Sequence, residues 1–370
     1  MGTIKKKIIF IIPGMHGGGA ERVFSLLVRH INRDKYIPVL ALIKKEGKFL
    51  KDIPSDVEII DLNSNRARYA WCKIIKLLWN QKPDIVFSTL GQVNLMLASL
   101  KFLLPRKTKY IAREANIVSF NIPNEGSPML FYIFYKTFLR KMDLIICQSQ
   151  EMKLDLQKNF RVPIEKMKVI NNPVDINEIN IKRVEETERI NEKNYFLAVG
   201  RLEPQKGYDR LIQAFSLSPL LNAHLYIIGK GGEGSLEEKL KKQVSDLNLN
   251  NRVIFLGFQD NPYKYMNSCK ALIMTSHYEG FPNVAIEANA CGVPVIAFDC
   301  PGVREAIVDG VNGWLVEQDN INSLAQKIEQ VSAMEFDKNK ILEYVINKYK
   351  VNLIVNKYEH VFEEIKQVTS

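Results

Sequence analysis

The stretch YFLAVGRLEPQKGYDRLIQAF, residues 195–215, predicts a buried strand, a loop with two glycines and an amphipathic helix. Its first residues are apolar at every position, which suits a strand covered on both faces, and apolar residues recur at helical spacing after Gly207. A polar segment of linker character, residues 172–194, precedes it. The stretch therefore starts a second unit in which strands and helices alternate.

The same alternation runs through both halves of the chain and predicts parallel sheets with helices on each face. A helical run at 338–367 ends the chain. We expect two doubly wound α/β domains that face a central cleft. The expected strands are 7–14, 37–43, 57–62, 84–90, 109–115 and 144–149 in the first half and 195–202, 223–229, 253–258, 271–276, 293–299 and 313–317 in the second, with helices at 19–31, 208–218 and 235–247.

Composition narrows the class of protein. The 370 residues are 46% hydrophobic and 25% charged, as in soluble globular proteins, and no apolar run approaches the roughly 20 residues of a membrane span. Five cysteines without a C-x-x-C pair favour reduced thiols in the cytoplasm over a zinc site. The net charge of +10 is concentrated in residues 1–180, which indicates a nucleic acid, an anionic membrane or an acidic substrate as partner.

Ligands of open parallel sheets bind at the carboxyl ends of the strands, so polar groups in the loops there are candidates for ligand contacts. In PGMHGGGAER, residues 13–22, three glycines precede a helix and expose backbone amides that suit an anion. The loop lacks the Lys-Ser/Thr of a P-loop, and Arg22 replaces the third glycine of the dinucleotide fingerprint. A tight turn explains these glycines equally well.

Two further loops carry cations or glycines. Arg201 and Lys206 follow a strand and suit a diphosphate, although a solvated loop is the usual place for such side chains. The stretch IIGKGGEGS, residues 227–235, matches G-x-G-x-x-G from Gly229 onward, which leaves a dinucleotide-dependent oxidoreductase open.

A fourth loop holds two glutamates in apolar surroundings, within HYEGFPNVAIEANACGVPVI at 277–296. Asn283 is the expected N-cap and Gly292 the residue past the end of a helix over 284–291. Glu279 then lies on the loop before the helix, where compensation of the helix dipole would explain it. Glu287 lies one turn inside, where its carboxylate can accept from the hydroxyls of a ribose.

Together these loops resemble the retaining glycosyltransferases of family 4, which have the GT-B fold, over nearly the whole chain. The resemblance implies domains at 1–175 for the acceptor and 190–345 for the nucleotide-sugar, with a C-terminal helix at 346–370 that packs toward the first domain. The motifs that carry it are EGFPNVAIE, GRLEPQKGYDRLIQAF, INNPVD (170–175), GGGAER and PGVREAIVDGVNGWLV (301–316).

The resemblance also implies residue roles. Arg201 and Lys206 match the pair that holds the diphosphate, Glu279 the glutamate near the donor sugar, and Glu287 the one on the ribose. No D-x-D is present, so fixed cations are expected in place of a metal, and no cofactor besides a UDP-sugar substrate is implied. Further contacts with the nucleotide-sugar are expected from Gly18, Gly19, Gly229, Phe281, Pro282, Asn283 and Val284.

One position departs from the family. Many relatives carry a histidine near residues 110–116, and this chain has Arg113, Glu114 and Asn116 there instead. These three, and His16 in the first loop, are expected to contact the sugar or the acceptor. Family members are thought to let the leaving phosphate take the acceptor proton, so no separate general base is assigned.

The first half of the chain, to which the resemblance assigns the acceptor, contains two segments rich in cations and aromatic residues. Residues 100–110 and 129–142 interleave aromatics, leucines and cations, as in an interfacial helix on an anionic leaflet, although a helix packed on the sheet has similar spacing. The implied acceptor is a glycan on polyprenyl diphosphate, used in O-antigen or capsule synthesis at the inner face of the cell membrane. A nucleotide-sugar epimerase of the same fold is the main alternative, and no nucleic-acid motif supports a nucleic-acid partner.

Overall fold

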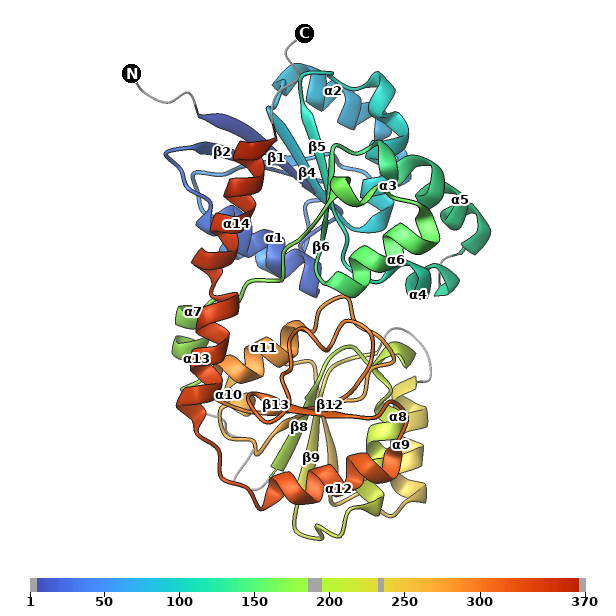
Figure 1. The fold of residues 1–370 in the computed structure, drawn as a ribbon, viewed down its shortest axis with the longest axis vertical. Coiled ribbons are helices and arrows are strands. Elements are labelled where there is room, and N and C mark those ends of the chain that lie inside the picture. Colours follow the sequence, from blue (N-terminus) through green and yellow to red (C-terminus); the bar gives the residue numbers. More distant parts are fainter. Residues whose placement is uncertain (1–4, 125, 186–194, 232–235, 366–370) are drawn as a thin grey trace. The chain divides into compact units, whose positions relative to one another are not determined.

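The computed structural model describes residues 5–124, 126–185, 195–231 and 236–365. The chain forms two compact units (Figure 1). Unit 1 contains the residues up to Pro173 together with those from Val351 onward, and unit 2 contains Val174–Lys350. The chain thus leaves unit 1, builds unit 2 and returns. The strand-and-helix alternation of the sequence is present in both units, which confirms the two parallel-sheet domains.

The described part of unit 1 is built on a parallel sheet of seven strands in the order β3-β2-β1-β4-β5-β6-β7. Alternate side chains of the central strand enter different cores: Ile9 packs on one face, and Ile8 and Phe10 on the other. Both faces are therefore buried, as the all-apolar strands predicted. The strands are β1 (Lys6–Ile12), β2 (Tyr36–Leu42), β3 (Glu58–Asp61), β4 (Ile85–Thr89), β5 (Lys109–Arg113), β6 (Leu144–Cys147) and β7 (Met167–Val169).

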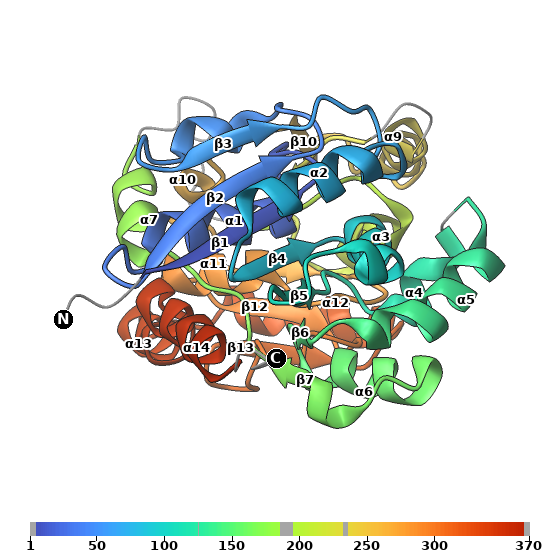
Figure 2. The same ribbon diagram turned by 90° about the horizontal axis from the view of Figure 1, so that it is seen from above.

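Helices cover both faces of this sheet (Figure 2). Helices α1 (Gly19–His30) and α14 (Val351–Glu364) pack on one face. The opposite face carries α2 (Trp71–Gln81), α3 (Gly91–Leu100), α4 (Val118–Asn121), α5 (Pro128–Phe138) and α6 (Gln150–Phe160). Short 3₁₀ turns are η1 (Lys48–Asp52), η2 (Ala67–Tyr69), η3 (Lys101–Leu103), η4 (Ile122–Asn124), η5 (Leu139–Lys141) and η6 (Ile164–Lys166).

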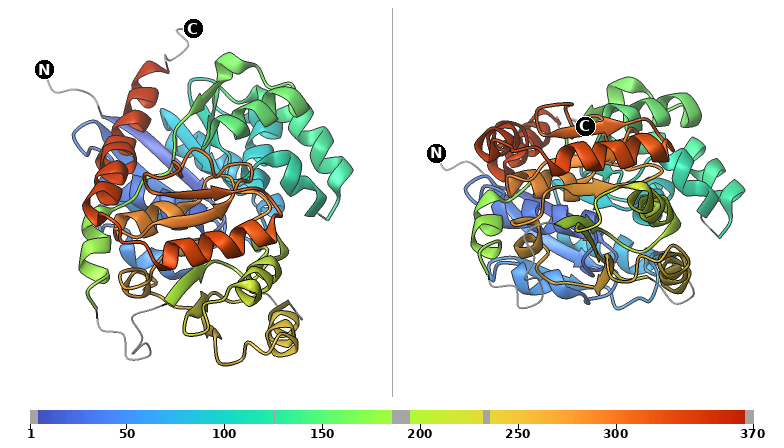
Figure 3. Two further views of the ribbon diagram at one scale, coloured as in Figure 1. Left: turned by 60° about the horizontal axis from the view of Figure 1, so that its bottom comes forward. Right: turned by 90° about the horizontal axis from the view of Figure 1, so that it is seen from below.

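Unit 2 repeats the plan with six parallel strands among its described residues, in the order β10-β9-β8-β11-β12-β13. They are β8 (Tyr195–Val199), β9 (His224–Ile228), β10 (Val253–Gly257), β11 (Leu272–Met274), β12 (Val295–Phe298) and β13 (Gly313–Val316). Figure 3 shows α8 (Tyr208–Leu217), α9 (Leu236–Asp246) and α12 (Ile321–Ser332), which pack on one face. The other face carries α7 (Ile176–Lys182), α10 (Tyr263–Met266), α11 (Asn283–Ala290) and α13 (Lys338–Tyr349).

Three segments differ from the sequence expectation. The polar stretch 172–194 contains α7, whose apolar residues join the core of unit 2, and its residues 186–194 lie outside the described part. Residues 100–110 hold the end of α3, the turn η3, a loop and the start of β5 rather than a helix. The C-terminal helical run is divided at Lys350 into α13 and α14.

Among the described residues there is neither a membrane-spanning helix nor a disulfide bond. None of the helices in the described ranges is long and apolar enough to cross a membrane. All five cysteines are free thiols, and Cys72 is exposed whereas the other four are buried.

Helix α14 completes one core of unit 1 with aromatic side chains. The ring of Phe362 lies 5.6 Å from that of Phe87 on β4 and 6.0 Å from that of Tyr36 on β2. Tyr358, one turn earlier, also contacts Phe87. Helix α14 therefore covers the face of the sheet formed by β1, β2 and β4.

We expect Phe362→Ala to lower the free energy of unfolding of unit 1 by about 3–5 kcal/mol, because a fully buried ring leaves a cavity. Urea denaturation followed by circular dichroism measures this change. Leu353→Ala, on the exposed side of the same helix, is the matched control and should change stability by no more than about 0.5 kcal/mol. Equal midpoints for the two variants would contradict the role given to α14.

Candidate active site

The strand order of unit 2 reverses between β8 and β11, which are neighbours in the sheet although far apart in sequence. In open parallel sheets such a reversal leaves a crevice beyond the carboxyl ends of the two strands, and ligands bind there. Arg201 and Lys206 follow β8, and Glu279 follows β11. The sheet therefore brings together residues that the sequence separates widely.

The central contact is an ion pair between Lys206 and Glu279. Lys206 Nζ lies 2.6 Å from Glu279 Oε1, and Ser276 Oγ donates to the same oxygen at 2.6 Å. The Glu279 side chain is 8% exposed and that of Lys206 20%, so water screens the pair little. The sequence assigned the two residues separate contacts, whereas the structure joins them.

Backbone contacts fix the two loops that carry this pair. Gln205 Nε2 donates to the Tyr278 carbonyl at 2.8 Å, and the Thr275 hydroxyl donates to the Lys206 carbonyl at 3.1 Å. Gly207 has a φ of +59°, and a Cβ there would collide with the Thr275 carbonyl oxygen. The glycine thus allows the loop after β8 to lie directly against the loop after β11.

Arg201 differs from Lys206 in its surroundings. Its side chain is 68% exposed, and its Nη1 lies 2.7 Å from Glu203 Oε1. An exposed pair of this kind contributes little to stability, so the guanidinium can exchange its partner at low cost. The structure places it on the same loop as Lys206.

Helix α11 follows Glu279 and begins at Asn283, with Pro282 rather than the expected Asn283 at the N-cap position. Phe281 is buried and its ring packs 5.5 Å from that of Tyr349, while Asn283 and Val284 are partly exposed. Glu287 lies in the second turn and is 9% exposed. The helix ends as predicted, because Gly292 has a φ of +74° and Val293 N–H donates to the Ala288 carbonyl.

In the G-x-G-x-x-G motif that starts at Gly229, the first glycine is required by the packing of two loops. A Cβ at Gly229 would collide with the Gly200 carbonyl oxygen, so the loops after β8 and β9 can approach only with glycine there. Gly231 leaves only ordinary contacts for a Cβ, and Gly234 lies outside the described residues.

The first glycine loop lies in unit 1. Gly18 precedes α1 in an extended conformation and Gly19 is its first residue. His16 is exposed, with its Nε2 3.4 Å from Glu46 Oε1. Gly17 has a φ of +124°, which explains one glycine of the three by backbone conformation.

Arg113 and Glu114, at the end of β5, are both buried but have different partners. Arg113 is fully buried; its Nη2 donates to Asn172 Oδ1 at 2.5 Å and its Nη1 to Thr89 Oγ1 at 3.3 Å. Its side chain therefore belongs to the interior of unit 1. Glu114 lines a cavity of about 210 Å³, together with Asn116.

The carboxyl of Glu114 is held by two residues that the sequence reasoning missed. Asn94 Nδ2 donates to Oε1 at 2.8 Å, and the Tyr135 hydroxyl donates to Oε2 at 3.2 Å. Burial raises the pKa of Glu114 to about 7, against the opposing effects of these two hydrogen bonds and of Arg113. The available signal was Asn94, a polar residue amid the apolar positions of α3.

No group of three or more His, Cys, Asp or Glu side chains is placed to hold a metal ion in the part of the chain that the structure describes. The charged groups at the carboxyl edge of unit 2 instead include an ammonium, a guanidinium and carboxylates. Such a set can bind an anion and the hydroxyls beside it.

Both halves of the chain are similar to known proteins. The family model described as Glycosyltransferase Family 4 matches residues 17–178, and that described as Glycosyl transferases group 1 matches residues 180–349. An N-acetylgalactosamine-N,N'-diacetylbacillosaminyl-diphospho-undecaprenol 4-alpha-N-acetylgalactosaminyltransferase of Campylobacter jejuni is 30% identical over 351 residues, which cover 90% of this chain and 91% of that protein. A poly(ribitol-phosphate) alpha-N-acetylglucosaminyltransferase of Staphylococcus aureus is 33% identical over 232 residues, which cover 60% of this chain and 44% of that protein.

Solved structures share the fold. HepE of Anabaena, crystallised in complex with UDP, matches with a TM-score of 0.77 at 23% identity, over 97% of this chain and 100% of that one. A glycosyltransferase of Rickettsia africae matches with a TM-score of 0.81 at 21% identity, over 99% of this chain and 100% of that one. With two matching family models and a relative aligned over nearly its full length, this chain belongs to the family 4 glycosyltransferases of the GT-B fold.

Proposed function

We propose that this enzyme transfers a hexose or N-acetylhexosamine from a UDP-sugar to a glycan acceptor carried on polyprenyl diphosphate. The transfer retains the anomeric configuration, needs no metal ion and serves the synthesis of a surface polysaccharide. The observation that carries the proposal is the Lys206–Glu279 pair beside Arg201 at the strand reversal of unit 2.

Relatives support the choice of substrates. The printed name of the Campylobacter protein specifies a diphospho-undecaprenol acceptor and an N-acetylgalactosaminyl group. HepE of Anabaena was crystallised with UDP and also with UDP-glucose. A capsular polysaccharide biosynthesis glycosyltransferase of Staphylococcus aureus is a further relative, 26% identical over 309 residues.

The charges of unit 2 suggest how the leaving group is stabilised. Breaking the bond between sugar and phosphate places additional negative charge on the diphosphate, and fixed cations there lower the barrier. Lys206 is already oriented by Glu279, so it needs little rearrangement to donate to a phosphate oxygen. Arg201 exchanges its exposed partner Glu203 for the diphosphate. The leaving phosphate then takes the proton of the acceptor hydroxyl.

We expect Arg201→Ala and Lys206→Ala each to lower turnover by at least about tenfold, the equivalent of 1.4 kcal/mol in the barrier. The assay is release of UDP from a panel of UDP-hexoses and UDP-N-acetylhexosamines. Lys241→Ala is the matched control for Arg201→Ala, because Lys241 forms an exposed pair with Glu237 on α9 just as Arg201 does with Glu203. Full activity in both site variants would refute the assignment of these cations.

Metal independence has its own test. The wild-type enzyme, dialysed against EDTA, should keep its rate of UDP release, because Lys206 and Arg201 supply the positive charge that a divalent ion supplies in enzymes with D-x-D. A rate that vanishes with EDTA and returns with manganese would overturn this part of the proposal.

The membrane contact is assigned to helix α5. Its inner face joins the core through Tyr135 and Phe131, yet its outer face is also apolar, with side chains 37–73% exposed at the four positions that we call the α5 patch: Met129, Leu130, Ile133 and Phe134. A helix that is hydrophobic all round is normally covered on all sides. Figures 1 and 2 show α5 at the outer edge of unit 1.

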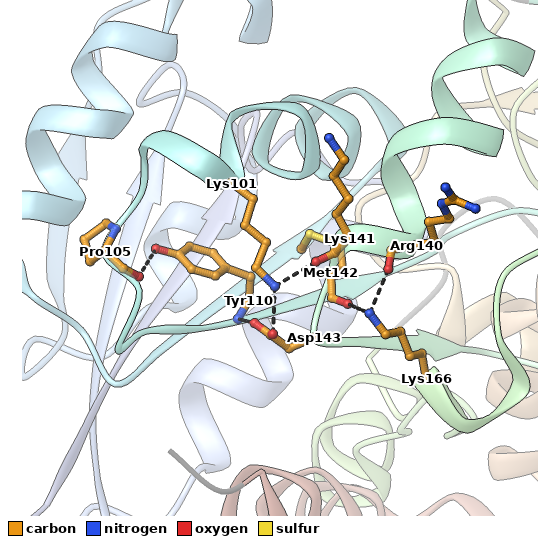
Figure 4. A network of polar contacts seen from close by, with 8 residues as sticks. All are labelled: Lys101, Pro105, Tyr110, Arg140, Lys141, Met142, Asp143 and Lys166. Carbon is orange, nitrogen blue, oxygen red and sulfur yellow. Dashed lines mark hydrogen bonds and ion pairs between the residues drawn. The ribbon is translucent and has the colours of Figure 1, made fainter. Parts of the chain in front are cut away.

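Cations lie at the end of this helix. Figure 4 shows Lys101 and Lys166 turned toward backbone carbonyls, where Lys101 Nζ donates to the Lys141 carbonyl at 2.7 Å and Lys166 Nζ to the Arg140 carbonyl at 2.8 Å. The side chains of Arg140 and Lys141 point away from that network and are exposed. Exposed cations next to an apolar patch fit the anionic inner leaflet of a cell membrane.

We expect the enzyme to float with vesicles that contain anionic lipid at low salt, and Ile133→Glu to remove most of that binding by placing a charge in the α5 patch. Leu353→Glu, a similarly exposed position on α14, is the matched control. Sedimentation of the wild-type enzyme away from the vesicles would contradict the proposed membrane contact. It would leave the sugar-transfer proposal intact.

A further inference from the structure

Arg210 is a buried cation on α8 that the proposed mechanism does not use. The residue is 8% exposed, and groups from three other segments surround its guanidinium. Nη2 donates to the Thr275 carbonyl, Nη1 pairs with the Asp319 carboxylate, and Cζ lies 5.0 Å from the centre of the Phe298 ring. Arginine is rarely buried unless it is paired, so these contacts explain how the cation is held inside unit 2.

The backbone at Gly207 makes room for the contact between Arg210 and Thr275. A Cβ at Gly207 would collide both with Arg210 Nη2 and with the Thr275 carbonyl oxygen. Any larger residue would therefore displace the donor, the acceptor or both. The loop after β8, the start of α8 and the end of β11 thus meet at one point, and the guanidinium lies there.

Thr275 connects Arg210 to the candidate active site. The Thr275 hydroxyl donates to the Lys206 carbonyl at 3.1 Å, and the hydroxyl of the next residue, Ser276, donates to Glu279 Oε1 at 2.6 Å. The Thr275 carbonyl and the Ser276 N–H belong to one planar peptide group, so a donor that fixes the carbonyl also fixes the backbone at Ser276. From this one peptide, contacts run to both members of the Lys206–Glu279 pair.

Asp319 orients the guanidinium by an ion pair. It lies between β13 and α12, and its φ of +64° is a left-handed conformation that aspartate adopts more readily than most residues. Its side chain is 62% exposed, and an ion pair with such an exposed partner contributes little. The contact of Arg210 with the buried Thr275 carbonyl therefore carries most of the effect on the loop.

We infer that Arg210 is a positioning residue for sugar transfer, which holds the Thr275 carbonyl and thereby keeps the Lys206 ammonium in place for the leaving diphosphate. The inference rests on the proposed function, because that function gives Lys206 its role. Placement matters for the rate, since a displacement of about 1 Å in a catalytic group can lower turnover about a hundredfold.

The test is a double-mutant cycle between Arg210 and Lys206. Arg210→Met removes the donors but keeps a flexible apolar side chain that can fill the space of the stem. In the otherwise wild-type enzyme this change should lower turnover, measured as UDP release, about tenfold to a hundredfold. In Lys206→Ala the same change should lower turnover less than about threefold, because the ammonium that Arg210 positions is already absent.

Arg252→Met is the matched control, because Arg252 makes the same kinds of contact at the amino edge of the same sheet. It directly precedes β10, its Nη2 donates to the Leu220 carbonyl at 2.8 Å, and its Cζ lies 4.8 Å from the centre of the Phe215 ring. Arg252→Met should leave turnover within about twofold of the wild-type value, even where it lowers the urea midpoint.

Equal losses of turnover from Arg210→Met in the two backgrounds would overturn the inference, because they would show that Arg210 does not act through Lys206. If circular dichroism shows that Arg210→Met does not fold, Thr275→Val decides instead. It removes the hydroxyl that bonds the Lys206 carbonyl and nearly keeps the volume. Its loss of turnover should likewise disappear in Lys206→Ala, and an unchanged rate in Thr275→Val would contradict the route through Thr275.

Hydrogen exchange separates a failure of this inference from a failure of the proposed function. The His277 N–H donates to the Gln205 carbonyl at 2.8 Å, so its exchange rate reports the contact between the two loops. Arg210→Met should speed this exchange at least about tenfold and Arg252→Met should not, whether or not a UDP-sugar is the substrate. Absence of UDP release from the wild-type enzyme would refute the proposed function, whereas equal exchange in Arg210→Met and the wild type would refute the role of Arg210.

Discussion

The ion pair between Lys206 and Glu279 is the interaction on which the arrangement of unit 2 depends. It joins the loops after β8 and β11 where the strand order reverses, and it satisfies a carboxylate that is almost fully buried. Removing one partner of such a pair typically costs about 3–5 kcal/mol, because the other charge stays buried. The pair therefore fixes both loops and the Lys206 ammonium that the proposed mechanism uses. The stability of unit 2 and the proposed binding of a diphosphate thus depend on the same contact.

The two units use one topology for different chemistry. Each places polar groups beyond the carboxyl ends of the strands at which its order reverses. In unit 2 these groups carry charge, which suits a diphosphate, whereas the cavity of unit 1 is lined by amides and one carboxyl. Two similar sheets thus present different polar groups at corresponding places.

Much of the fold followed from the sequence, because strands that are apolar at every position are hard to mistake when helices separate them. The helix α7 was missed, since its few apolar residues are embedded in a polar stretch, and the short β7 carried no clear strand signal. Within the site, features of a single loop could be predicted from the sequence: Gly292 follows the end of α11 as expected. The sequence could not predict contacts between separate segments, because their proximity depends on the order of the strands. These contacts are the Lys206–Glu279 pair and the hydrogen bonds of Asn94 and Tyr135 to Glu114.

The division of the chain has a consequence for its synthesis. Unit 2 is continuous in sequence, but one face of the unit 1 sheet is covered by α1 and by α14, and α14 is translated after the whole of unit 2. During translation the part of that face under α14 stays open while unit 2 emerges and can fold. Unit 1 is thus begun before unit 2 and completed after it, and the nascent chain exposes an apolar surface that a chaperone could cover until α14 arrives.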